Sequence, residues 1–185
     1  MGLSENFRFY TSGFKNMKVL TDQNSLPSNS GGICGGLALT WLKSRSGTLK
    51  TGEGLRTPLF TLEETASSVH HYDLDGGKNR ELAGKSSEVI SLVGTNDPGG
   101  LRDKTPWGGT YKIYEIASSK GHGHFMGAYF PWIGDPQFYD PNLVHCEIEK
   151  SSFFDLISKW PKIYDNQGGA QWGFEYLYVI KSSEV

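Results

Sequence analysis

The sequence predicts an α+β fold in which helices come first and antiparallel strands follow. Apolar residues recur with a helical period in the first half of the 185-residue chain, whereas beyond residue 110 the period changes and the segments are typical of strands. Glycine, with 24 residues, is well above its usual share of roughly 7%, and aromatic residues make up 13%, a composition that suggests long loops and a packed sheet. Because helices and strands are segregated along the chain, an alternating βαβ arrangement is not expected.

Helices are predicted in four segments. The first spans 33–45, whose apolar residues fall on one face. A second begins at Thr61, because Glu64, three residues later, gives the spacing of a capping box. The two remaining helices are predicted at 80–93 and 152–160.

Strands are predicted in the second half of the chain, after a glycine- and proline-rich loop at 94–109. They span 111–116, 123–130, 137–139, 144–148 and 174–180. The length is that of one domain, so we expect a single catalytic domain over 1–185 with an irregular N-terminal segment at 1–28.

Composition excludes several classes of protein. Eighteen lysines and arginines against 20 aspartates and glutamates give a net charge of -2, which excludes the basic surface of a nucleic-acid-binding protein. No apolar run approaches the roughly 18–20 residues of a membrane span. The N-terminus lacks the apolar stretch of a secretory signal peptide. Two cysteines, Cys34 and Cys146, in unlike contexts do not form a disulfide framework.

Cys34 lies at the predicted start of the first helix, just after the pair Gly31-Gly32. The free N–H groups and positive dipole end of a helix N-terminus stabilise a thiolate and can bind a developing oxyanion. Glycines before the sulfur allow a substrate backbone to come close. The pattern therefore indicates a nucleophile, with a small cysteine buried in the core as the structural alternative.

A nucleophilic cysteine needs a base, and the base needs an acceptor that fixes its tautomer. The candidate bases on predicted strands are His122, His124 and His145, while the remaining two histidines, His70 and His71, look solvated. The best acceptor is Asp140, at a strand end sixteen residues after His124, since one turn can place neighbouring strands side by side. Asp135 lies within a turn and is a poorer candidate.

A zinc site is the competing interpretation of the same side chains. The residues that could serve as four ligands are His122, His124, His145 and Cys146. Their spacing does not match the common zinc patterns, and Cys34 would be left without a role. We therefore expect no metal and no other cofactor.

Three segments resemble motifs of the YopT/AvrPphB-type cysteine proteases, a family of effectors that bacteria deliver into host cells. Gly-Ile-Cys34-Gly-Gly-Leu-Ala-Leu resembles the nucleophile helix, His124-x-Met-Gly-x-Tyr the histidine strand, and Phe-Tyr-Asp140-Pro-Asn the aspartate strand. The order of the motifs and the spacing from histidine to aspartate also agree. The resemblance covers the layout of residues 29–180.

This resemblance implies a papain-like fold and a thiol protease, with Cys34 as nucleophile, His124 as base and Asp140 as its orienting acceptor. It implies that Asn29, five residues before Cys34, helps to form the oxyanion hole. The implied substrate is a host signalling protein, such as a small GTPase or a kinase. The resemblance further implies a toxin or virulence factor that is secreted by a non-classical route, without a signal peptide, and acts in the host cytosol. The sequence does not specify a chaperone or immunity partner.

Two other functions remain open at this point. Papain-like toxins use the same triad to deamidate or transamidate glutamine, and related enzymes cleave peptidoglycan, so sequence does not separate these reactions from proteolysis. A binding module with a degenerate triad is the alternative outside the enzymes, although an intact triad argues against it.

Overall fold

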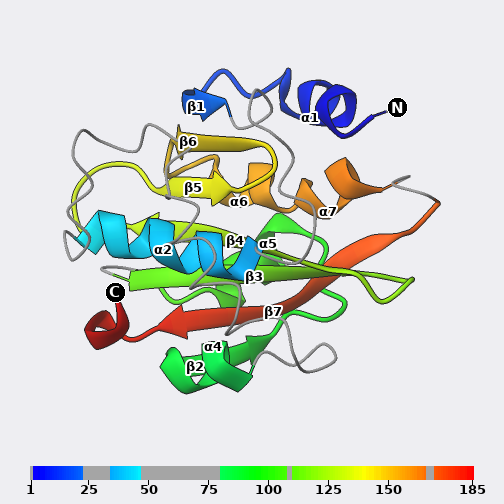
Figure 1. The fold of residues 1–185 in the computed structure, drawn as a ribbon. Helices are drawn as coiled ribbons and strands as arrows, with labels where there is room; N and C mark the ends of the chain where they lie inside the picture. Colours follow the sequence, from blue (N-terminus) through cyan, green and yellow to red (C-terminus); the bar gives the residue numbers. More distant parts are fainter. Residues whose placement is uncertain (1, 23–33, 47–79, 108–109, 166–168) are drawn as a thin grey trace.

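The structure is a computed structural model that describes residues 2–22, 34–46, 80–107, 110–165 and 169–185. Figure 1 shows the arrangement of its helices and strands. In chain order, the elements are α1 (Leu3–Thr11), β1 (Met17–Asp22), α2 (Cys34–Ser46), α4 (Arg80–Lys85), β2 (Ser86–Ser91), α5 (Pro98–Lys104), β3 (Thr110–Ser118), β4 (Gly123–Phe130), β5 (Gln137–Asp140), β6 (Val144–Ile148), α6 (Phe153–Ile157), α7 (Trp160–Tyr164), β7 (Trp172–Ile180) and the short 3₁₀ helix η2 (Ser182–Glu184).

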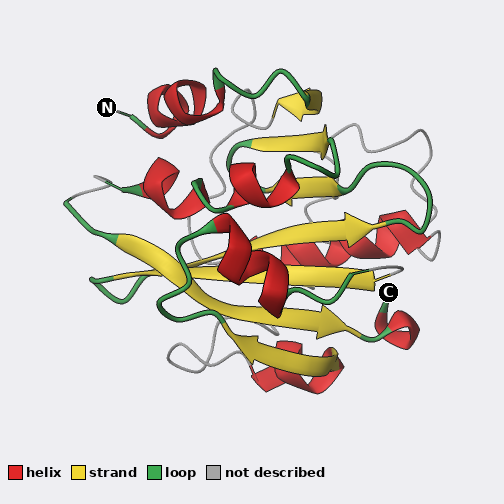
Figure 2. Ribbon diagram, turned by 180° about the vertical axis from the view of Figure 1, so that it is seen from behind, coloured by secondary structure: helices red, strands yellow, loops and turns green. Residues whose placement is uncertain are grey.

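The described strands form one seven-stranded sheet in the order β1-β6-β5-β4-β3-β7-β2. Every pairing in it is antiparallel. Helices α2 and α4 lie on one face of the sheet (Figure 1), and α5, α6 and α7 lie on the other, as the view from behind shows (Figure 2). The predicted α+β class with an antiparallel sheet is confirmed. Among the described residues, no helix has the length and apolarity that crossing a bilayer requires.

The elements that carry the candidate site residues match the sequence prediction closely. The helix expected at 33–45 is α2, and the strand expected at 123–130 is β4, with the same bounds. The other four predicted strands are β3, β5, β6 and β7. Helices cover both faces of the sheet, so most positions of these strands are buried. Short runs rich in aromatic and β-branched residues, bounded by turn residues, made these strands visible in the sequence.

The prediction of an irregular segment at 1–28 is wrong for the part that the structure describes. Helix α1 buries Phe7 against Trp160, with ring centroids 5.9 Å apart. Strand β1 pairs with β6 at the edge of the sheet. Both elements are stabilised by partners more than 120 residues away in the chain, and local sequence patterns do not reveal such partners.

Three other predicted elements differ from the observed ones. The helix predicted at 80–93 ends after α4, because the following residues form β2 and pair with β7. The helix predicted at 152–160 is two short helices, α6 and α7, and Pro161 at the start of α7 has no N–H with which to continue a longer helix. The loop predicted at 94–109 contains α5, capped by Asp97, whose carboxylate accepts the Gly100 N–H at 2.9 Å. The helix predicted from Thr61 lies outside the described residues.

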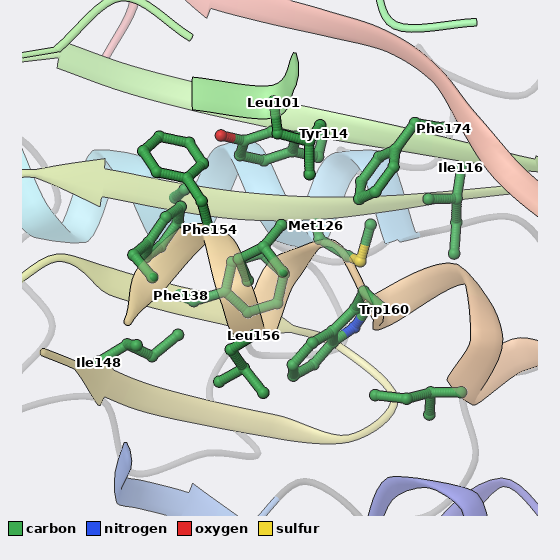
Figure 3. Packing of buried hydrophobic residues seen from close by; sticks show 14 of the residues in the cluster. Leu101, Tyr114, Ile116, Met126, Phe138, Ile148, Phe154, Leu156, Trp160 and Phe174 are labelled. Carbon is green, nitrogen blue, oxygen red and sulfur yellow. The ribbon is translucent and has the colours of Figure 1, made fainter. Parts of the chain in front are cut away.

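Two hydrophobic cores lie on opposite faces of the sheet. The larger is rich in aromatic residues and fills the space between the sheet and α5, α6 and α7. Figure 3 shows Trp160 in this core near Met126, Phe138 and Leu156. The smaller core lies beneath α2 and α4. Together they fix both layers of helices against the same central strands.

Helix α2 approaches β4 most closely at Gly127. A Cβ atom at this position would lie 2.7 Å from Cε3 of Trp41. Trp41 is fully buried and stacks on Tyr139 with ring centroids 5.4 Å apart, so the indole has little room to move. Glycine at 127 therefore permits the close packing of the helix that begins with Cys34.

We predict that Gly127→Ala lowers the free energy of unfolding by about 1–3 kcal/mol, because the added methyl group overpacks this contact. Urea denaturation of the variant measures the change. Gly173→Ala is the matched control, since a Cβ there has no heavy atom within 4 Å. Equal stabilities for the two variants would contradict the close packing of α2 on β4.

Candidate active site

Cys34 is the first residue of α2, and its side chain is partly exposed. Residues 35–42 of this helix are all buried, which is typical of a helix enclosed on every side. The thiol therefore lies at the positive end of a helix dipole on a firmly held element. The side chain of Cys34 lies close enough to the imidazole of His124 to raise the pKa of that ring.

His124 and Asp140 come from the neighbouring strands β4 and β5. The pairing of these strands ends at Gly127 and Tyr139, so continuing the register places Asp140 across from Met126. Met126 and His124 share one face of β4, because they are two residues apart. His124 Nε2 lies 3.1 Å from Oδ1 of Asp140, and both side chains are buried.

The carboxylate of Asp140 is fully buried, and each of its oxygens has hydrogen-bond donors. Oδ1 accepts the backbone N–H of Asn142 at 2.8 Å in addition to the bond from His124. Oδ2 accepts the indole N–H of Trp160 at 2.7 Å. The hydroxyl of Tyr164 lies 3.0 Å from Oδ1 and 2.9 Å from Oδ2. Such donors stabilise a buried negative charge.

The electrostatics favour a charged pair in this buried setting. Burial by itself raises the pKa of Asp140, but the charge of His124 and the hydrogen bonds from His124, Trp160 and Asn142 lower it further than burial raises it. Burial lowers the pKa of His124, but the charge of Asp140, its hydrogen bond and the contact with Cys34 raise it by more. Both shifts favour the charged forms of the pair, which are an imidazolium at His124 and a carboxylate at Asp140.

Trp160 and Tyr164 are site residues that the sequence prediction missed. Trp160 is the last residue of the helix predicted at 152–160, and Tyr164 lies beyond that predicted helix. Both lie on α7, four residues apart, so they share one face of that helix. The spacing is visible in the sequence, but it becomes informative only once α7 is known to pack against Asp140.

The structure does not bring the other candidate histidines to Cys34. His122 precedes β4 and is exposed. His145 lies on the face covered by α2, where it packs against Trp41 with ring centroids 5.4 Å apart, and burial followed by the charge of Arg45 lowers its pKa to about 3. Asp135 accepts the backbone N–H of Lys150 in the turn after β4.

The four ligands of the zinc alternative are likewise not gathered at one place. Cys146 is fully buried, and its burial, followed by the charge of Asp140, raises the pKa of its thiol. In the part of the chain that the structure describes, no group of three or more histidine, cysteine, aspartate or glutamate side chains is placed to hold a metal ion. Asn29, His70 and His71 lie outside the described residues.

Comparison with known proteins is informative at the level of the fold. No protein-family model and no curated protein sequence matches the chain. Among solved structures, the fold is similar to that of the Pseudomonas avirulence protein AvrPphB, at 13% sequence identity and a TM-score of 0.53. The match covers 85% of this chain and 97% of that protein. At this identity the likeness shows a shared fold, which is the fold that the three sequence motifs imply.

We predict that Cys34 reacts with iodoacetamide before Cys146 does. Cys34 is partly exposed beside an imidazolium, whereas Cys146 is buried as a neutral thiol. Brief labelling with limiting reagent, followed by mass mapping, measures the difference, and labelling in denaturant is the control in which both thiols react. Equal labelling of the two cysteines in the folded protein would contradict the assignment of Cys34 as the nucleophile.

We also predict that Asp140→Asn destabilises the protein in a pH-dependent way. The pKa of Asp140 is lower in the folded chain than in the unfolded one, so its contribution is present above the unfolded value and is lost as the pH falls. The loss should be about 3 kcal/mol at neutral pH, and it should shrink below about pH 4.

Thermal unfolding of Asp140→Asn and of the wild type across this pH range measures the effect. Asp135→Asn is the control, because Asp135 accepts only the N–H of Lys150 in a turn. A deficit in Asp140→Asn that does not vary with pH would show that Asp140 is not ionised in the folded protein.

Proposed function

We propose that this protein is a cysteine protease with Cys34, His124 and Asp140 as its catalytic triad. The observation that carries the proposal is the buried pair of His124 and Asp140, with Nε2 3.1 Å from Oδ1, next to the Cys34 side chain at the N-terminus of α2. This is the arrangement by which a thiol is activated as a nucleophile. The shared fold with AvrPphB and the three sequence motifs support the same reaction.

In the first half of the reaction, the Cys34 thiolate attacks the carbonyl carbon of a peptide bond. The carbonyl oxygen takes up negative charge, and the sulfur becomes bonded to carbon. His124 then donates its proton to the nitrogen of the leaving amine, and the peptide bond breaks. The product of this half is an acyl group on Cys34.

In the second half, His124 is neutral and accepts a proton from a water molecule. That water attacks the thioester, and Cys34 leaves as a thiolate beside the restored imidazolium. Asp140 remains ionised throughout and stabilises the imidazolium each time it forms. No cofactor takes part in these steps.

The oxyanion requires donors near the sulfur. The free N–H groups at the start of α2 can supply one, and we extend the proposal to the side chain of Asn29 as a second. The proposal also retains a host signalling protein as the substrate and the host cytosol as the place of action, as the effector family implies.

Product analysis tests the reaction. Lysate of a eukaryotic host cell is incubated with the wild type or with Cys34→Ala, and new chain termini are identified by mass spectrometry. Termini that appear only with the wild type support proteolysis. If glutamine side chains become glutamate and no new termini appear, the reaction is deamidation by the same triad and not proteolysis. If the two samples do not differ, the proposal that the protein is an enzyme is overturned.

We predict that His124→Ala lowers the rate at such a cleavage site by about 10³-fold or more, because the proton donor for the leaving amine is lost. His122→Ala is the matched control, since this exposed side chain lies only two residues away and outside β4. Its rate should stay close to that of the wild type. A greater loss of rate in His122→Ala than in His124→Ala would show that His124 is not the catalytic base.

A further inference from the structure

Tyr164 of α7 contacts both His124 and Asp140. Its ring lies against the imidazole, with centroids 4.7 Å apart and planes inclined by 32°. Its hydroxyl oxygen is 2.8 Å from Nε2 of His124, closer than the 3.1 Å from that nitrogen to Asp140. Trp172 packs against Tyr164 in turn, with centroids 5.3 Å apart.

The available protons permit one consistent arrangement of these bonds. If Tyr164 donated its proton to an unprotonated Nε2, that nitrogen would have no proton to donate to Asp140. The lone pair of Nε2 and the carboxylate oxygen would then face each other at 3.1 Å as two acceptors. When Nε2 carries a proton instead, this single N–H is shared between the carboxylate of Asp140 and the hydroxyl oxygen of Tyr164. The hydroxyl of Tyr164 then donates its own proton to Asp140. This tautomer leaves Nδ1 as the ring nitrogen available to Cys34.

Tyr164 can act as this donor because it stays a neutral phenol. Burial, followed by the negative charge of Asp140, raises the pKa of Tyr164 well above its ordinary value. The tyrosine is also held in place from behind, since the side chain of Asn6 in α1 donates to the backbone carbonyls of Ile163 and Asp165 at 3.0 and 3.1 Å. Helix α1 thus holds the end of α7 that carries the hydroxyl.

We propose that Tyr164 is a positioning residue, which fixes the tautomer and tilt of His124 by accepting from Nε2 and donating to Asp140. The role rests on the proposed function, because it acts through the imidazole that serves Cys34. Asp140 alone does not supply this constraint, since its Oδ1 is shared with the N–H of Asn142. The ring stacking of Tyr164 on His124 restricts the tilt as well.

The variant that tests the role is Tyr164→Phe, which keeps the ring and removes only the hydroxyl. Its control is Tyr114→Phe, because Tyr114 is another fully buried tyrosine of the same core, and its hydroxyl contacts Thr105 at 3.2 Å. The titratable side chains that contact His124 in the described structure are Cys34, Asp140 and Tyr164. The rate at which iodoacetamide alkylates Cys34 therefore reports on the imidazolium across a pH series.

We expect Tyr164→Phe to slow alkylation about 10- to 100-fold between about pH 5 and 6, the loss of one hydrogen bond to a charged group. The sign follows because a less stabilised imidazolium supports less thiolate at a given acidic pH. At alkaline pH, where the thiolate forms unaided, the variant and the wild type should converge. Tyr114→Phe should follow the wild type throughout, even where it loses thermal stability.

Proton NMR supplies a second measurement. The Nε2 proton of His124 should give a downfield resonance that is absent in His124→Gln, and Tyr164→Phe should shift or broaden it. If Tyr164→Phe keeps the alkylation rates and the resonance of the wild type, the positioning role is overturned, whereas the proposed protease function is not affected. A wild type whose Cys34 reacts only at alkaline pH would instead overturn the proposed function, and with it the role of Tyr164.

Discussion

A carboxylate that is removed completely from water requires hydrogen-bond donors for both oxygens, and the site around Asp140 follows from that requirement. Four donors come from three parts of the chain: the histidine of β4, a backbone N–H after β5, and two side chains of α7. Each donor restricts where its own element can lie. The polar network therefore joins the centre of the sheet to the helices on one face and gives His124 a fixed orientation.

Cys34, the proposed nucleophile, is carried by α2 on the opposite face of the sheet. Helix α2 can place Cys34 beside His124 because β4 and β5 stop pairing just before the histidine, so the imidazole is reached from both faces. The close contact at Gly127 sets how near the helix lies to β4. Packing under α2 and hydrogen bonding under α7 thus position two halves of one site independently.

The sequence predicted those parts of the site whose signal is local. Cys34 follows glycines at the start of a helix, and His124 and Asp140 lie on two short strands rich in aromatic residues that one turn joins. The parts that were missed depend on distant partners. Strand β2 is recognisable only through its pairing with β7, about 90 residues later, and Tyr164 gains its role only because α1 and α7 pack together. The periodicity of a short stretch of sequence does not predict contacts with such distant residues.

Two independent observations meet at Cys34, His124 and Asp140. The motifs concern side chains, whereas the likeness to AvrPphB at 13% identity concerns the path of the backbone, and that likeness alone would suit a binding module equally well. The residues that the motifs single out are nevertheless the ones that the fold brings into contact, while His122 and His145 stay apart. Replacing a buried ion pair with apolar residues of similar volume is often neutral or stabilising. A buried imidazolium and carboxylate beside a partly exposed thiol are therefore better explained by catalysis than by stability.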